Sequence, residues 1–139
     1  MKKAKIILVW ALISTFLAAF MVFPPSRVSA ASYGEVTRSG STWTAKVNGT
    51  TVYTGSDMFA AVQAAINGLT PNRTWKETVR IKNSGSSGSS GGSIKAINIA
   101  SYTVLDFGGC QIECNSGDNL IVPIQGERKT DIEILNLKI

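Results

Sequence analysis

The amino-acid sequence predicts a mainly β protein, in which a small β-meander and one amphipathic helix precede a solenoid of short strands. After residue 94 the chain consists of short β-rich segments separated by polar corners. No Asn-Gly or Asp-Gly hairpin signal stands between them, although Gly108-Gly109 could serve as one. A pattern of inward, outward and inward side chains recurs at residues 97–99, around Ile112 between Cys110 and Cys114, and at residues 132–134. The spacing of roughly 15 to 20 residues approaches the period of a solenoid coil. A β-sandwich or barrel is the alternative for the same composition.

Length and charge limit the function classes. The chain has 139 residues, no histidine and two cysteines; that length allows one domain of ordinary size. Without histidine there is no Ser-His-Asp or Cys-His nucleophile system and no HExxH zinc site. The formal net charge is +5, but four basic residues lie in the first 30 positions, and the rest of the chain carries a net charge of +1. We therefore expect no nucleic-acid partner.

Residues 1–30 have the pattern of an export signal. Three lysines in the first five positions precede an uncharged run of 18 residues, from Ile6 to Phe23, and then two prolines and the small-residue site Val-Ser-Ala at 28–30. This order predicts a signal peptide cleaved after Ala30. A membrane anchor is the alternative, because the run just reaches the length of a spanning helix. The proline break and the small-residue site favour a secreted protein with no stable membrane insertion.

The sequence pattern of residues 31–55 predicts the small β-meander. Asn48-Gly49 stands between two β-rich segments, and this dipeptide favours a type I′ turn, which needs positive φ at both central positions. Alternation between the two faces of a strand then places three apolar side chains together: Trp43, Ala45 and Val47.

The next elements are a helix, a strand and a loop. Apolar residues spaced by three and four predict a helix over residues 57–67, with Ser56 as N-cap and Asp57 in the first turn. Alternation over residues 77–82 predicts a strand with Val79 and Ile81 on one face. Residues 84–93 (SGSSGSSGGS) contain no apolar side chain and predict a mobile surface loop. A phosphate-binding P-loop would end in Lys-Ser or Lys-Thr, and this run lacks that ending, so we do not expect it to bind phosphate.

Three segments resemble a known family. SYTVLDFGGCQIECN, at residues 101–115, resembles an early coil of the secreted right-handed parallel β-helix proteins of the pectin-lyase-like superfamily. RKTDIEILNLKI, at 128–139, resembles a following coil, and MFAAVQAAINGL, at 58–69, is similar to their N-terminal capping helix. The resemblance covers residues 56–139 and implies a helix cap followed by the first coils of a right-handed parallel β-helix. Because a solenoid needs several repeats and two caps, we expect the chain to be truncated at its C-terminus.

The resemblance implies a function in polysaccharide metabolism. Enzymes of this fold are polysaccharide lyases or glycoside hydrolases, and their carboxylates bind calcium or act as acid and base. Those groups lie on middle coils, so we expect no catalytic, cofactor or metal residue here, and an inactive fragment. Calcium would belong to the full-length protein. The alternatives are a non-enzymatic adhesin or carbohydrate-binding surface protein, and a complete small β domain closed by a disulfide.

Three residues are candidates for substrate binding. Trp75 lies in a polar loop and offers a ring face that stacks on a sugar. Arg128 and Lys129 form a cationic corner at the edge of a surface that meets an anionic polysaccharide. Asp106 and Asp118 are better explained as hydrogen-bond acceptors of turns than as catalytic or calcium-binding groups.

The two cysteines are predicted to be reduced and buried in the core. On a continuous strand, the Cα atoms of Cys110 and Cys114 would lie about 13 Å apart, too far for a disulfide. A tight bend at residues 111–113 would reverse this prediction and favour a disulfide, which the predicted export would permit.

Overall fold

The computed structural model describes residues 30–115 and 117–139, so the predicted leader lies outside the described residues, apart from Ala30. Strands dominate the described part, and they form three separate sheets beside one α-helix. The prediction of a mainly β protein is therefore confirmed. The largest sheet is mixed and has six strands in the order β10-β7-β4-β1-β2-β3, and none of the three sheets is closed.

The predicted meander is formed by the first three strands, which pair antiparallel in sequence order: β1 (Tyr33–Ser39), β2 (Thr42–Val47) and β3 (Thr50–Gly55). The connection between β2 and β3 is the predicted two-residue turn, with φ of 51° at Asn48 and 81° at Gly49. The predicted apolar face is confirmed as well, because three side chains of β2 are buried: Trp43, Ala45 and Val47.

Helix α2 (Met58–Asn67) covers the sheet, and its N-cap is Asp57 rather than the predicted Ser56. The Asp57 backbone is extended, and its Oδ1 accepts hydrogen bonds from the amides of Phe59 (2.8 Å) and Ala60 (3.2 Å). Its Oδ2 lies 2.7 Å from the Lys95 ammonium, an ion pair that the uncharged Ser56 could not form. Six helical side chains are buried: Met58, Phe59, Ala61, Val62, Ala65 and Ile66.

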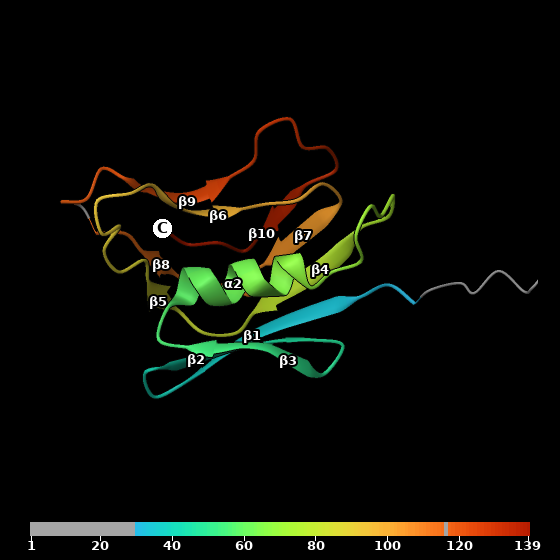
Figure 1. Ribbon diagram of the computed structural model, residues 1–139, viewed down its shortest axis with the longest axis horizontal. Coiled ribbons are helices and arrows are strands. Elements are labelled where there is room, and N and C mark those ends of the chain that lie inside the picture. The colour runs from blue at the N-terminus through green and yellow to red at the C-terminus, as the bar shows by residue number, and fades with distance from the viewer. Residues whose placement is uncertain (1–29, 116) are drawn as a thin grey trace, which may run out of the picture.

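The remaining strands pair in parallel. Their bounds are β4 (Glu77–Ile81), β5 (Gly85–Ser86), β6 (Lys95–Asn98), β7 (Thr103–Asp106), β8 (Ile112–Glu113), β9 (Ile121–Gln125) and β10 (Glu133–Leu135). Strands β4, β5 and β6 pair with β7, β8 and β9, respectively, and β10 pairs with β7. An isolated parallel bridge joins Gln111 to Lys138. Successive stretches of chain are thus laid beside one another in the same direction (Figure 1).

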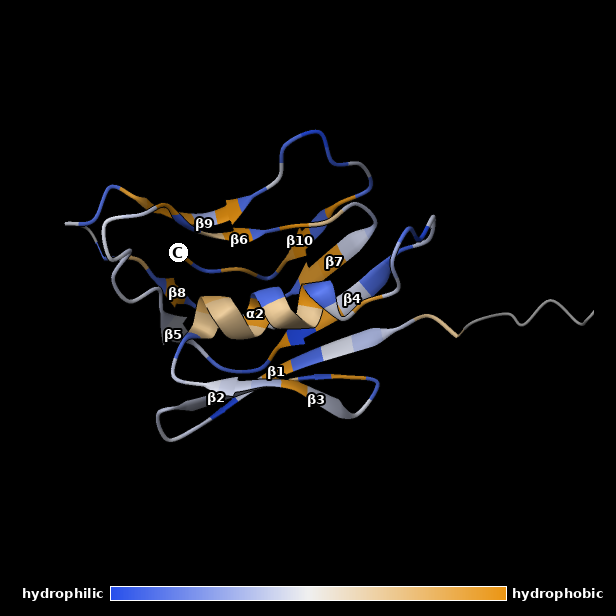
Figure 2. Cartoon of the chain, in the orientation of Figure 1, coloured by the Kyte–Doolittle hydropathy of each residue, from blue (hydrophilic) through white to orange (hydrophobic). Residues whose placement is uncertain are grey.

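The core lies between α2 and the inward faces of these strands. In Figure 2 the apolar segments of β4 and β7 lie beside the helix, with β6 and β9 on one side and the meander on the other. Six strand residues in this core have no exposed surface: Val36, Ala45, Val79, Ile81, Ile97 and Leu105. The helix therefore covers the strands as the amphipathic sequence pattern predicts.

The Ser-Gly run departs from its prediction. Gly85–Ser86 forms β5, and the next residue, Ser87, is 1% exposed, so a surface loop is the wrong description of residues 85–87. Gly85 is buried against Trp43 and Met58, which lie within 3 Å of the position that a Cβ atom would take. The large side chains come from other elements, and the glycine supplies only the space, so the run itself needs no apolar residue.

Candidate functional site

The loops that precede β4, β7 and β10 lie side by side and carry the predicted binding residues. The Glu77 amide donates to the carbonyl of Tyr102 (3.0 Å), and the Tyr102 amide donates to the carbonyl of Thr130 (2.9 Å). An ion pair between Lys76 and Glu133 adds a side-chain contact between the first loop and the start of β10. We call this row of loops, residues 70–76, 100–102 and 126–132, the loop surface.

Trp75 is the exposed aromatic side chain of the loop surface. It is 41% exposed, and its indole Nε1 donates a hydrogen bond to Oε1 of Glu77 at 3.0 Å. This bond holds one edge of the ring, while a large part of the indole stays accessible. An aromatic ring held in this way offers a flat apolar surface at a low cost in conformational entropy.

Glu77 is 1% exposed and is the residue that sequence reasoning missed. Its carboxylate accepts hydrogen bonds from the Ser32 amide (2.8 Å), from the Thr70 amide (2.8 Å) and hydroxyl (2.7 Å), and from Trp75. Burial alone would raise the pKa of Glu77, but these hydrogen bonds outweigh it and hold the pKa below its ordinary value. The missed signal was the strand alternation, which places Glu77 on the same face as Val79 and Ile81.

Arg73 fixes the loop before β4 to the start of β7. It is 8% exposed and donates hydrogen bonds to the carbonyls of Tyr102 and Thr70, both at 3.0 Å, and to the Thr103 hydroxyl. Its Nε lies 3.9 Å from Oε2 of Glu77. Burial lowers the pKa of Arg73, and the charge of Glu77 opposes that shift. The two buried charges compensate each other beneath Trp75.

Arg128 and Lys129 lie at the far side of the loop surface, between β9 and β10. Both are exposed. The Arg128 Nε lies 3.7 Å from Oε1 of Glu127, and both of these side chains are largely in solvent. No hydrogen bond or ion pair among the described residues joins Arg128 or Lys129 to Trp75. The structure brings the three loops together but does not gather the three predicted side chains around one point.

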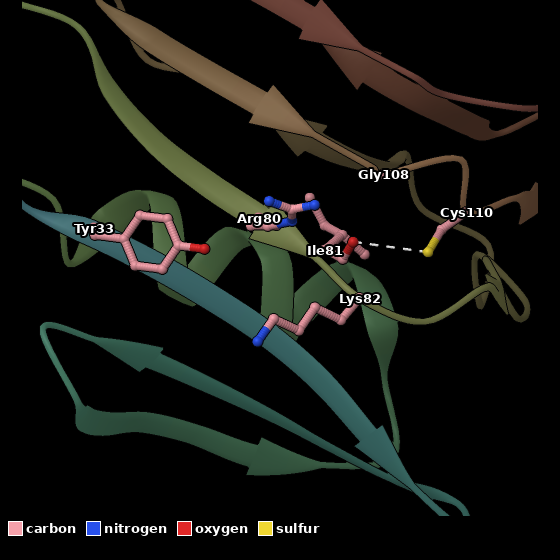
Figure 3. A pocket seen from close by; sticks show the side chains of 6 residues that line it. All are labelled: Tyr33, Arg80, Ile81, Lys82, Gly108 and Cys110. Atoms are coloured by element: carbon pink, nitrogen blue, oxygen red, sulfur yellow. Dashed lines mark hydrogen bonds between the residues drawn. The ribbon is translucent and has the colours of Figure 1, made fainter.

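A second feature is an open hollow of about 550 Å³ on the outer face of β1 and β4 (Figure 3). It is lined by Tyr33, Arg80, Ile81, Lys82, Gly108 and Cys110. Its two cations already face carboxylates: Lys82 lies 2.7 Å from Glu35, and Arg80 lies 3.8 Å from Asp106. The charges around the hollow are thus balanced, and it has no marked preference for either sign of ligand.

Asp106 and Asp118 act in turns, as the sequence predicts. Asp106 accepts hydrogen bonds from the Gly108 amide (2.9 Å) and the Asn136 side chain (3.1 Å). The bond from Asn136, followed by that from Gly108, lowers the pKa of Asp106. Asp118 accepts from the amides of Ser90 (2.7 Å) and Leu120 (3.2 Å), so it also ties the Ser-Gly run to the following turn.

Both cysteines are free in the structure. The segment between them is not one continuous strand, since β8 contains only Ile112 and Glu113. Cys110 and Cys114 are half-buried at the edge of the core, and the Cys110 thiol donates to the carbonyl of Ile81 at 3.7 Å. Full burial was therefore the wrong expectation, because both cysteines lie outside the two-residue strand β8 and are only half-buried.

The described residues contain neither a cluster of metal ligands nor a helix that could span a membrane. Within residues 30–115 and 117–139, no three Cys, Asp or Glu side chains are grouped closely enough to hold a metal ion. The one helix in these ranges is too short to cross a membrane. Comparison with protein-family models, curated proteins and solved structures found no match.

Proposed function

We propose that this chain is the N-terminal part of a secreted right-handed parallel β-helix protein that acts on polysaccharides as a lyase or a glycoside hydrolase. The parallel pairing of β4, β5 and β6 with β7, β8 and β9 supports the coiled path, and α2 lies where a cap would cover the first coil. The catalytic groove would lie on further coils, and the present residues would supply the cap and a contact with the polysaccharide.

The anchored indole of Trp75 is the observation that carries the proposed polysaccharide contact. A half-exposed ring with a fixed edge stacks on the apolar face of a pyranose without first having to be ordered. Arg128 and Lys129, on the far loop of the loop surface, would add attraction for anionic polysaccharides. The stacking contact tolerates neutral and acidic sugars alike, whereas the cationic contact favours acidic ones.

Binding of the secreted protein to a panel of neutral and acidic polysaccharides tests this proposal. We expect Trp75→Ala to weaken binding to both kinds about fivefold, since a stacked ring contributes on the order of 1 kcal/mol. The double variant Arg128→Gln/Lys129→Gln should weaken binding to acidic polysaccharides alone, and only at low salt. Val52→Ala, at another exposed apolar position, is the control. Unchanged binding by Trp75→Ala, or no binding by the parent protein, would contradict the proposal.

A non-enzymatic surface binder is the second candidate function. The loop surface supports it, because a stacking ring and two exposed cations can hold a polysaccharide but cannot break a glycosidic bond. Release of new reducing ends or of unsaturated products, measured with and without calcium, separates the two functions in the full-length protein. We expect no turnover by the 139-residue chain itself, and clear turnover would show that the catalytic groups lie within it.

A further inference from the structure

Ser32, the second residue after the predicted cleavage site, forms hydrogen bonds with three residues. Its amide donates to Oε1 of the buried Glu77 at 2.8 Å, and its hydroxyl lies 3.1 Å from the Thr70 hydroxyl. The side-chain amide of Asn48 donates to the same Ser32 hydroxyl at 3.2 Å. The start of the described chain is therefore fixed against the same buried carboxylate that holds the indole of Trp75.

Removal of the leader would place a positive charge beside this carboxylate. Hydrolysis of the Ala30–Ala31 bond consumes one water, and it leaves a carboxylate on Ala30 and an α-ammonium on Ala31. Neighbouring backbone nitrogens are no more than about 3.6 Å apart. Because the Ser32 nitrogen lies 2.8 Å from Glu77, the new ammonium would lie within roughly 6.5 Å of the carboxylate, close to the range in which opposite charges shift pKa values.

We propose that Glu77 and Thr70 form a binding site for the α-ammonium that cleavage after Ala30 creates, so that processing completes the fixation of the N-terminal segment. Oε1 of Glu77 already accepts three hydrogen bonds, whereas Oε2 accepts only the one from the Thr70 amide and retains acceptor capacity. The Arg73 guanidinium is the charged group that faces Glu77, and its Nε stays 3.9 Å away. Ser32, Asn48 and Trp75 face this region with neutral groups.

The inference rests on the proposed secretion, so the first measurement is N-terminal sequencing of the secreted protein. A mature chain that begins at Ala31 supports the cleavage step, and one that begins elsewhere overturns it. This result is independent of polysaccharide binding, so either proposal can fail without the other.

The second measurement compares the mature chain with a variant that carries Gly-Ser before Ala31. The extension moves the ammonium away from Glu77 and leaves every described contact in place, so both proteins should fold. We expect the pKa of the α-ammonium, followed by NMR, to be raised in the mature chain relative to the extended one. A raised pKa stabilises the fold below the unfolded value of about 8, and this stabilisation is lost as the pH rises through the folded value.

We expect the Tm of the mature chain to be about 2–4 °C higher than that of the extended chain at pH 6.5, and this difference in Tm to fall toward zero at pH 10. Glu77→Gln, where it folds, should remove both the pKa difference and the Tm difference. Equal pKa values in the mature and extended chains would overturn the ammonium site, even with cleavage after Ala30 established.

Discussion

The packing of Gly85 yields a sharp test of the fold, because a methyl group at this position has no space. A Cβ atom added to Gly85 would lie 2.4 Å from Cζ2 of Trp43 and 2.9 Å from Sδ of Met58. Gly85 is not among the glycines with positive φ, so the backbone itself accepts alanine. The cost of Gly85→Ala therefore comes from the contact with the indole and the thioether.

Relief of such a contact requires movement of a large buried ring or of the β5 backbone. Overpacking of this kind typically costs about 1–3 kcal/mol. In a domain of this size, each kcal/mol lowers the Tm by roughly 4–8 °C. We therefore expect Gly85→Ala to lower the Tm by at least 4 °C and to shift the urea midpoint without changing the slope of the transition.

Gly117→Ala is the matched control. Gly117 is exposed, has no positive φ, and its added Cβ would meet only the Asn115 side chain at an ordinary 3.6 Å. This substitution should leave the stability unchanged or raise it slightly. The double variant Trp43→Leu/Gly85→Ala should be more stable than the sum of the two single effects predicts, because the smaller side chain removes the clash. Equal stability of the Gly85→Ala and Gly117→Ala proteins would refute the packing of β5 against Trp43.

Three further predictions concern charges and thiols. Glu77→Gln should destabilise the protein at neutral pH by about 2–4 kcal/mol. Because the fold lowers the pKa of Glu77, the ionised carboxylate stabilises the protein above its ordinary pKa of 4.5, and this stabilisation is lost on acidification. The difference in stability between the parent and the variant should therefore shrink as the pH falls below 4.5. Denaturation curves of both proteins between pH 2.5 and 7 measure this difference in stability. Asp57→Ala should cost about 1–2 kcal/mol, since it removes both the N-cap of α2 and the partner of Lys95; Lys95→Met, which keeps the cap, should cost less. Under denaturing conditions without reductant, alkylation should add two groups, at Cys110 and Cys114; an unmodified mass would show a disulfide instead.

The sequence predicted the elements whose signals are local. Asn48-Gly49 specifies its turn through the backbone conformation of two residues, and α2 follows from apolar side chains three and four positions apart. The short strand β5 could not be predicted in this way. It has two residues and no apolar side chain, and its burial depends on Trp43, which is 42 positions away in the sequence.

The candidate site was predictable only in part for the same reason. Trp75 could be proposed as exposed from its polar neighbours, and the structure confirms that exposure. Its orientation depends on Glu77, whose carboxylate is in turn held by Ser32, 45 positions away. The position of Arg128 and Lys129 beside the other loops likewise depends on the bond between Tyr102 and Thr130. Sequence patterns identify such side chains, but long-range hydrogen bonds decide which of them come together.

The contacts of Glu77 also link the candidate site to the N-terminal segment. One carboxylate oxygen, Oε1, accepts hydrogen bonds from both the Ser32 amide and the Trp75 indole. Loss of the Ser32 contact would leave buried acceptor capacity open to water, and the indole bond would then compete with hydration. Because the same oxygen serves both groups, deletion of residues 31 and 32 should increase the mobility of the Trp75 ring, although the two segments share no direct hydrogen bond. The order of the proposed polysaccharide contact therefore depends on the first residues of the predicted mature chain.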